Sequence, residues 1–355
     1  MDFGVSFQSH ILNSWKHAVL AEQLGFSHAW FVDTQMLASD VYACMTLAAE
    51  HTRAIRLGTA VAVAGTRIAP VIAHSIATVN QLAPGRVILG LGTGHTAWRA
   101  MGLPPVRLAA FRHTIEVCRG LLRGEEVEYH EQGRPSRVRF FDLEHGYLNV
   151  RDPVPIYVAA SHPQALALAG ELGDGLITIS ILSPDLLTAN LATVAQGRAK
   201  QTSRPADFPV VTIGVSCVLR PGEGMESPRV LARVGPRIAV ALHYAYEIVR
   251  QGEKAPSYLQ AFLTPAYCAY LERRWSEIHA THSRFLHPGE EEFITPAAIQ
   301  AMSLTGTRED ITARLKRLEA AGLTQFVISP PWGYVEESIV EFAREIAAHY
   351  EDDSQ

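Results

Sequence analysis

A regular alternation of short apolar runs with segments of helical periodicity constrains the fold of this chain more than any other feature. Eight apolar runs recur along the sequence, and helical segments separate them. Continuous apolar runs are typical of strands that are covered on both faces, as in a parallel sheet. The runs lie at residues 4–7, 28–32, 55–63, 87–91, 155–160, 176–180, 210–219 and 326–329.

Eight strands alternating with helices predict an α/β fold, a (β/α)8 TIM barrel. A doubly wound sheet is the competing architecture. The barrel is favoured by the strand count and by the length of 355 residues, since a barrel needs about 250 residues. We therefore expect a single barrel domain over residues 1–355.

Two insertions account for the remaining length. Residues 125–151 change to an alternating pattern, which predicts a β-hairpin excursion with its turn near 133–135. Residues 222–295 predict a mostly helical insertion that forms a cap. Aromatic side chains either line an apolar substrate pocket or pack the interior of the cap: Tyr244, Tyr246, Phe262, Tyr267, Trp275 and, outside the insertion, Trp332.

Composition excludes several classes of protein. Hydrophobic residues make up 48% and charged residues 19%, which suits a large core and excludes disorder as the main state. A formal charge of −5 argues against a nucleic-acid binder. No apolar stretch reaches the roughly 18 residues of a membrane span. The four cysteines form no C-x-x-C pair, and the first residues lack a signal-peptide pattern, so we expect a reduced, cytoplasmic protein.

In a parallel barrel, functional side chains gather where the strands end at their carboxyl side. The loop that follows the run at 87–91 carries Thr93, Gly94 and His95. Its glycines allow a tight bend, and its amides and hydroxyls suit an anion or the edge of a cofactor. The plainer interpretation is an ordinary strand-to-helix turn, because the spacing is not that of a Rossmann motif.

Ser161 and His162 follow the strand at 155–160, and a helix opens at Pro163. The free amides of a helix start, together with the Ser161 hydroxyl, predict a phosphate site. The alternative is that Ser161 only caps the helix.

Three titratable residues also lie at expected strand ends. Asp33 could contact a cofactor ring or relay a proton, or it could only cap a helix or form a surface salt bridge. His10 and His95 are candidates for general acid or base catalysis near neutral pH, although a structural role is the commoner one for a histidine. No metal site is expected, because the sequence contains neither H-x-H nor H-E-x-x-H. A nucleophile elbow, G-x-S-x-G, and a Walker A motif are also absent.

At this level of detail the chain resembles the bacterial luciferase-like family of flavin- and F420-dependent oxidoreductases. The resemblance covers residues 1–220 and 300–350, and it is nearest to the methylenetetrahydromethanopterin reductase-like branch, judged from the LLRGEEV segment at 121–127 and the GTG at 92–94. The matching segments are AEQLGF at 21–26 with AWFVD at 29–33, IRLGT at 55–59, APGRVILGLGTG at 83–94, and PIYVAA at 155–160 with AGELGDGLI at 169–177.

The resemblance implies a barrel that binds reduced FMN or F420 at its mouth, with a non-prolyl cis peptide near residues 60–62. Carried over by position, the cofactor-binding residues are Asp33, Ala60, Val61, Thr93, Gly94, Ser161 and Ile177, and His162 is a further candidate beside Ser161. Two departures from the family pattern stand out. Thr34 replaces a common histidine, which shifts proton transfer to His10 and His95, and His162 replaces a common glycine.

The preferred function is a monooxygenase that uses reduced FMN and O2 on a small organic substrate, fed by a separate flavin reductase. A cap that excludes water would favour this chemistry. The alternatives are an F420-dependent reductase or dehydrogenase that transfers hydride, and a non-catalytic flavin-binding barrel. The resemblance also allows a homodimer. It implies neither a nucleic-acid partner nor a membrane partner.

Overall fold

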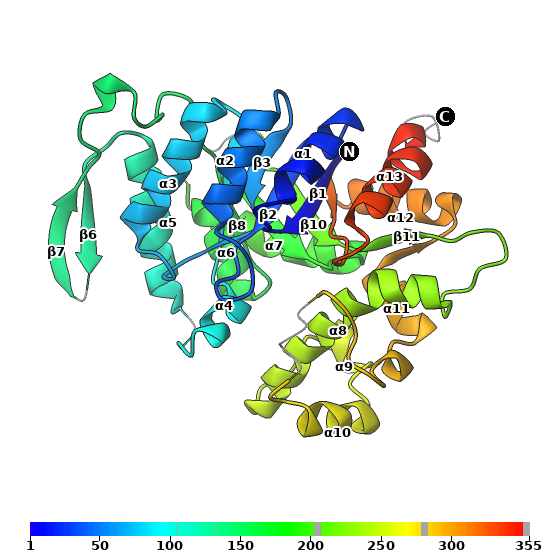
Figure 1. Cartoon of the computed structure of the whole chain (residues 1–355). Helices are drawn as coiled ribbons and strands as arrows, with labels where there is room; N and C mark the ends of the chain where they lie inside the picture. Colours follow the sequence, from blue (N-terminus) through cyan, green and yellow to red (C-terminus); the bar gives the residue numbers. More distant parts are fainter. Residues whose placement is uncertain (105, 132, 202–206, 278–282, 351–355) are drawn as a thin grey trace. The chain divides into compact units, whose positions relative to one another are not determined.

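The computed structural model describes residues 1–104, 106–131, 133–201, 207–277 and 283–350 (Figure 1). The chain divides into two compact units. The first consists of Met1–Ile179, Asp185–Ile213 and Ala321–Val327. The second consists of Ser180–Pro184, Gly214–Ala320 and Ile328–Gln355.

A closed barrel of eight parallel strands confirms the predicted fold class. The pairing runs β3-β2-β1-β13-β10-β9-β8-β5, and β3 also pairs with β5, which closes the ring. All eight predicted apolar runs contribute a barrel strand. The strands are β1 (Asp2–Gln8), β2 (His28–Val32), β3 (Arg56–Thr59) continued by β4 (Ala62–Val63), β5 (Val87–Gly92), β8 (Ile156–Ala159), β9 (Gly175–Ile179), β10 (Val210–Gly214) and β13 (Gln325–Ile328).

Helices follow the strands in chain order, and the blue to cyan helices of Figure 1 lie around the first strands. Those of the first unit bury an apolar face, which in the first three helices includes two or more alanines and allows close packing on the sheet. They are α1 (Ser14–Gln23), α2 (Val41–His51), α3 (Ala69–Leu82), α4 (His95–Ala100), α5 (Leu108–Leu122), α6 (Pro163–Leu172) and α7 (Pro184–Arg198).

The barrel interior is asymmetric in side-chain size. Large apolar side chains fill its lower part, and Ala60, Val61 and Ala159 pack against them from above while remaining half-exposed. These small residues lie at the carboxyl ends of their strands, at the mouth of the barrel. The large members are Trp30, Ile88, Tyr157, Ile177, Val211, Ile213 and Val327.

The run at 55–63 is not one strand, as the sequence suggests, but two strands separated by a bulge. Gly58 pairs with Ile88 and Ala62 pairs with Leu91, so β3 and β4 hold one residue more than β5 over this interval. An extra residue shifts the alternation of faces. The Ala60–Val61 peptide in the bulge is cis, in agreement with the expectation from the family resemblance.

Within residues 125–151, β6 (Val127–Glu131) and β7 (Arg134–Val138) pair as an antiparallel hairpin. Arg134 pairs with Glu131, so residues 134 and 135 belong to β7 and not to the turn predicted near 133–135. The hairpin lies along α5, where the ring of Tyr129 stacks on that of His113 at 5.9 Å between centroids. Figure 1 shows it at the left edge of the first unit.

The second unit has its own core and a small parallel sheet. The run at 210–219 ends its barrel strand at Gly214; the next segment, β11 (Ser216–Val218), pairs instead with β12 (Leu304–Gly306), which the sequence did not reveal. The helices are α8 (Pro228–Arg250), α9 (Ser257–Gln260), α10 (Pro265–Arg273), α11 (Pro296–Met302), α12 (Arg308–Ala320) and α13 (Val335–Glu345).

Aromatic side chains of the segment 222–295 mostly pack its core. Tyr246 and Tyr267 are buried there, and Phe262 and Trp275 pack against the same cluster. These four residues therefore follow the plainer of the two expectations. Among the helices that the structure describes, none combines the length and the apolar character needed to cross a bilayer.

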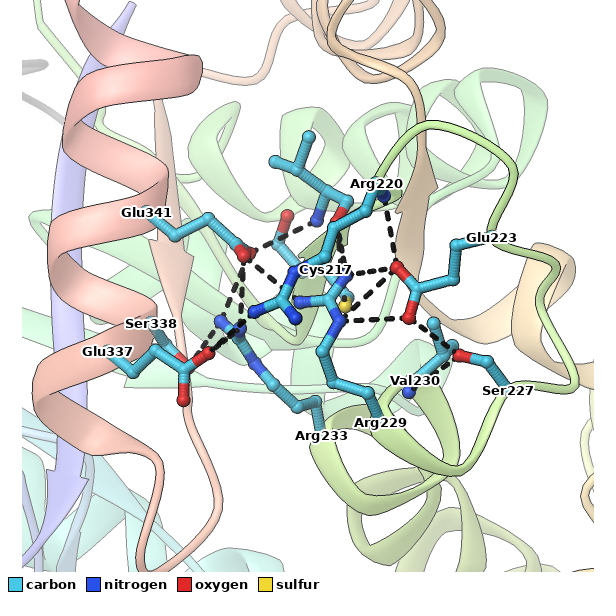
Figure 2. A network of polar contacts seen from close by, with 12 residues as sticks. Cys217, Arg220, Glu223, Ser227, Arg229, Val230, Arg233, Glu337, Ser338 and Glu341 are labelled. Atoms are coloured by element: carbon cyan, nitrogen blue, oxygen red, sulfur yellow. Dashed lines mark hydrogen bonds and ion pairs between the residues drawn. The ribbon is translucent and has the colours of Figure 1, made fainter.

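A network of charged side chains joins α8, α13 and β11 (Figure 2). Arg233 is only 1% exposed, and its guanidinium contacts Glu341 at 3.1 Å and Glu337 at 3.3 Å. Arg229, one turn earlier on α8, contacts Glu341 at 3.1 Å and Glu223 at 2.5 Å. Glu341 lies between the two arginines, so its charge compensates both.

Candidate functional site

The candidate residues of the sequence analysis all belong to the first unit, and most follow the carboxyl end of a barrel strand. Ala60 and Val61 follow β3, and Asp33 follows β2. Thr93 and Gly94 follow β5. A closed parallel barrel brings these ends to one rim.

A floor of small residues forms part of this rim. Ala60, Val61 and Ala159 are half-exposed above the barrel core. Gly92 faces them from β5: a Cβ on Gly92 would lie 2.5 Å from Val61 Cγ2 and 3.3 Å from Ala159 Cβ. The absence of a side chain at Gly92 keeps the floor open, as a flat aromatic ring would require.

The loop after β5 packs tightly on the same segment. Gly94 has φ +63, and a Cβ on it would lie 2.2 Å from Val63 Cγ1. Glycine is therefore required there for both its backbone conformation and its size. Thr93 is exposed beside it. Helix α4 begins directly at His95, a helix that the sequence analysis did not expect.

Asp33 is buried, with 4% of its surface exposed, and three donors surround its carboxylate. Gln35 Nε2 donates to Oδ1 at 2.7 Å, while Val63 N at 3.2 Å and Arg67 Nη1 at 2.9 Å donate to Oδ2. Burial raises the pKa of the Asp33 carboxyl above its usual value, against the opposing charge of Arg67. Asp33 thus forms a buried ion pair with Arg67 and not the surface salt bridge of the plainer interpretation.

Ser161 and His162 are both exposed at the start of α6. His162, not Ser161, occupies the N-cap position, and its side chain makes no capping hydrogen bond. The alternative that Ser161 is a plain helix cap is therefore wrong. Ser161 and the start of α6 follow the carboxyl end of β8, at the rim.

Ile177 is buried more deeply than a residue that contacts a cofactor at the barrel mouth would be. It is 1% exposed and belongs to the barrel core beneath Ala60 and Val61. Ile179 lies two residues further on the same face of β9 and is 53% exposed. Only the exact position of the strand end, which is hard to locate from sequence, distinguishes these two isoleucines.

Of the two candidate histidines, His10 is half-buried in the loop after β1, where its backbone amide donates to Ser14 Oγ at 2.7 Å. The backbone of His95 opens α4, and its side chain lies outside the described part of the chain. The two residues thus follow the carboxyl ends of β1 and β5, two different strands of the same rim.

The ion pair between Asp33 and Arg67 is the part of the site that sequence reasoning missed. The two residues lie 34 positions apart in different loops, and no local pattern links them. Only the strand order, which places β2 next to β3, could have suggested the pairing.

Comparison with known proteins agrees with this geometry. The model of the family described as luciferase-like monooxygenase matches residues 8–325. The chain is similar to 5,10-methylenetetrahydromethanopterin reductase of Methanolobus tindarius, with 29% identity over 96% of this chain and 98% of that protein. It is also similar to F420-dependent glucose-6-phosphate dehydrogenase of Beutenbergia cavernae, with 31% identity over 85% of this chain and 93% of that protein.

Among solved structures, the F420-dependent tetrahydromethanopterin reductase of Methanopyrus kandleri superposes with a TM-score of 0.73 at 20% identity, covering 98% of this chain and 99% of that one. The similarity also extends beyond the segments 1–220 and 300–350, because a match over 96% of the chain must include most of the helical insertion. A match of this length to the family model leaves one assignment: the chain belongs to the bacterial luciferase-like family of oxidoreductases.

Proposed function

We propose that this protein is an F420-dependent oxidoreductase that reduces or dehydrogenates a small organic substrate. The observation that carries the proposal is the similarity, over most of the chain, to a relative named as an F420-dependent dehydrogenase. This reverses the order of preference drawn from the sequence, where reduced FMN with O2 came first. Bound F420 would supply a carbon centre that accepts or donates hydride.

The residues at the rim fit such a cofactor. We assign the support of its ring to Ala60, Val61 and Ala159, with Gly92 leaving the approach open. Ile179 is the exposed apolar contact from β9, and Thr93 and Gly94 line the adjacent edge. The function of these residues is to bind and orient the ring.

Ser161 and the start of α6 are assigned to the phosphate of the cofactor tail. Backbone amides at a helix start bind anions, and a hydroxyl adds a further donor. The exposed His162 lies beside them. Proton transfer is assigned to the imidazole of His10, with His95 as the second candidate from its place at the start of α4.

The second candidate function, a reduced-FMN monooxygenase, is favoured by the description of the matching family. It would need reduced FMN from a separate flavin reductase. Titration of the purified protein with F420 and, separately, with reduced FMN distinguishes the two functions. Saturable binding of F420 with hydride transfer to a substrate supports the proposal. Oxygen-dependent substrate consumption with FMN, without affinity for F420, contradicts it, and binding without turnover on any substrate panel supports a flavin carrier.

Replacing Ser161 by alanine tests the phosphate site. We expect the dissociation constant for F420 to rise about tenfold, which corresponds to about 1.4 kcal/mol for one charge-assisted hydrogen bond. The thermal midpoint is expected to stay unchanged because Ser161 is exposed and does not cap α6. A change in thermal stability with unchanged affinity would instead mean a structural role.

A further inference from the structure

We propose that Arg67 is a positioning residue of the cofactor site, which holds the carboxylate of Asp33 against the segment between β3 and β4. The inference rests on the proposed function, because that segment forms the floor on which the cofactor ring is placed. Arg67 itself is assigned no contact with cofactor or substrate.

Two hydrogen bonds tie the floor segment to the β2 side of the barrel. At its start, the amide of Ala60 donates to the carbonyl oxygen of Phe31 at 2.7 Å. At its end, the amide of Val63 donates to Asp33 Oδ2 at 3.2 Å. The first bond is between backbone groups, whereas the second depends on one side chain. Asp33 therefore ties the end of the floor to the β2 side, while pairing with β5 holds its other side.

Asp33 accepts from three donors, and this set suits the ionised carboxylate best, because both of its oxygens act only as acceptors. Its side chain is 3% exposed, and a buried carboxylate needs a compensating cation. Arg67 Nη1 supplies that charge at 2.9 Å. Loss of Arg67 would favour the neutral form or an altered rotamer, and either change would weaken the hydrogen bond to the Val63 amide and leave Val63 held mainly by its pairing with β5.

The guanidinium of Arg67 is itself fixed in place. Its second nitrogen, Nη2, contacts Asp40 Oδ2 at 2.5 Å, and its Cζ lies 5.1 Å from the ring centroid of Tyr42. The two-pronged contact with Asp33 and Asp40 suits arginine, because a lysine ammonium lacks the planar fork. The side chain of Asp40 is 50% exposed, so its charge is well solvated without Arg67.

Asp40 provides the matched control, since Asp40→Asn removes one ion pair of Arg67 and leaves the pair with Asp33 in place. Titration of the full chain with F420, followed by its fluorescence, gives the dissociation constant. We expect Arg67→Met to raise it about tenfold, as for loss of a charge-assisted hydrogen bond, and Asp40→Asn to change it by less than about twofold. Arg67→Lys is expected to fall between the two, because the charge remains and the fork is lost.

The thermal midpoint of each variant separates positioning from general stability. Titrations are made well below the midpoints, where a merely structural role would leave affinity unchanged. Equal affinities of Arg67→Met and wild type would overturn the proposal, and so would equal losses in Arg67→Met and Asp40→Asn. If Arg67→Met does not fold, Asp33→Asn replaces it, and an unchanged affinity of that variant would likewise overturn the proposal.

The failure of the proposed function would look different from the failure of this inference. Wild-type protein that binds FMN but not F420 contradicts the proposed function, and the same variants titrated with FMN then test Arg67. Wild-type protein that binds neither coenzyme contradicts both, because the floor is then no cofactor site.

Discussion

Replacing Glu341 by glutamine is expected to lower the free energy of unfolding by about 3 kcal/mol, the low end of the cost of removing one partner from a buried ion pair. The carboxylate of Glu341 contacts both Arg229 and Arg233, and Arg233 is only 1% exposed. It also accepts a hydrogen bond from the amide of Val218 at 3.2 Å. Glutamine keeps the size of the side chain but removes the charge that both arginines share, which leaves the buried Arg233 only the exposed Glu337 and leaves Arg229 only Glu223 (Figure 2).

Glu337→Gln is the matched control. Glu337 lies one turn away on α13 and also contacts Arg233, at 3.3 Å, but its side chain is 49% exposed. Loss of a solvated partner is expected to cost at most about 1 kcal/mol. Urea denaturation compares the two variants, and hydrogen exchange at 216–218 reports the loss locally through the Val218 amide. Equal destabilisation by both substitutions would show that burial of Arg233 does not control the network.

Replacing Gly92 by valine is expected to raise the dissociation constant for F420 about 100-fold, equivalent to about 2.7 kcal/mol. The new Cβ would lie 2.5 Å from Val61 Cγ2, so Val61 must move and the added methyl groups occupy the space above the floor. Equilibrium titration with F420 measures the effect. This is the most direct test that the floor of small residues is the ring site.

Leu91→Val is the control for Gly92→Val. Leu91 is the preceding residue of β5, points to the opposite face of the strand and is fully buried. Its replacement is expected to lower stability by about 1 kcal/mol through lost packing, with affinity for F420 unchanged. If Leu91→Val weakened F420 binding as strongly as Gly92→Val, the effect would come from strand stability and not from the floor.

The barrel could be predicted from the sequence because each of its strands is a continuous apolar run between helical segments. Local patterns carry that information, and burial on both faces leaves little room for polar residues. The same local patterns do not predict where the chain leaves the barrel sheet and begins to pair with a strand of another sheet. Nothing in the run at 210–219 marks Gly214 as the end of the barrel strand, since both β10 and β11 are apolar and only their pairing partners differ.

The candidate site could be predicted to the level of loops rather than of individual side chains. Asp33 could be placed on the rim because parallel strand ends converge, a property of the fold alone, whereas Ala60 and Val61 followed from the family resemblance. The partners of Asp33 and the depth of Ile177 depend on register and on contacts between distant loops. Those are set by strand pairing in three dimensions, which residue spacing does not encode.

Because of the extra residue between β3 and β4, the number of residues in this segment determines the surface that it presents as much as their identity does. In a regular strand, the side chains at positions 58 and 63 would face opposite sides. The additional residue in the bulge places Gly58 and Val63 on the same side. Deleting one residue from 59–61 would remove the bulge while leaving Ala62 and Val63 in register with Leu91 and Gly92, so only the half-exposed segment at Ala60 and Val61 would change. A homologue one residue shorter at this point would therefore carry a different surface under its ligand even if every neighbouring amino acid were identical.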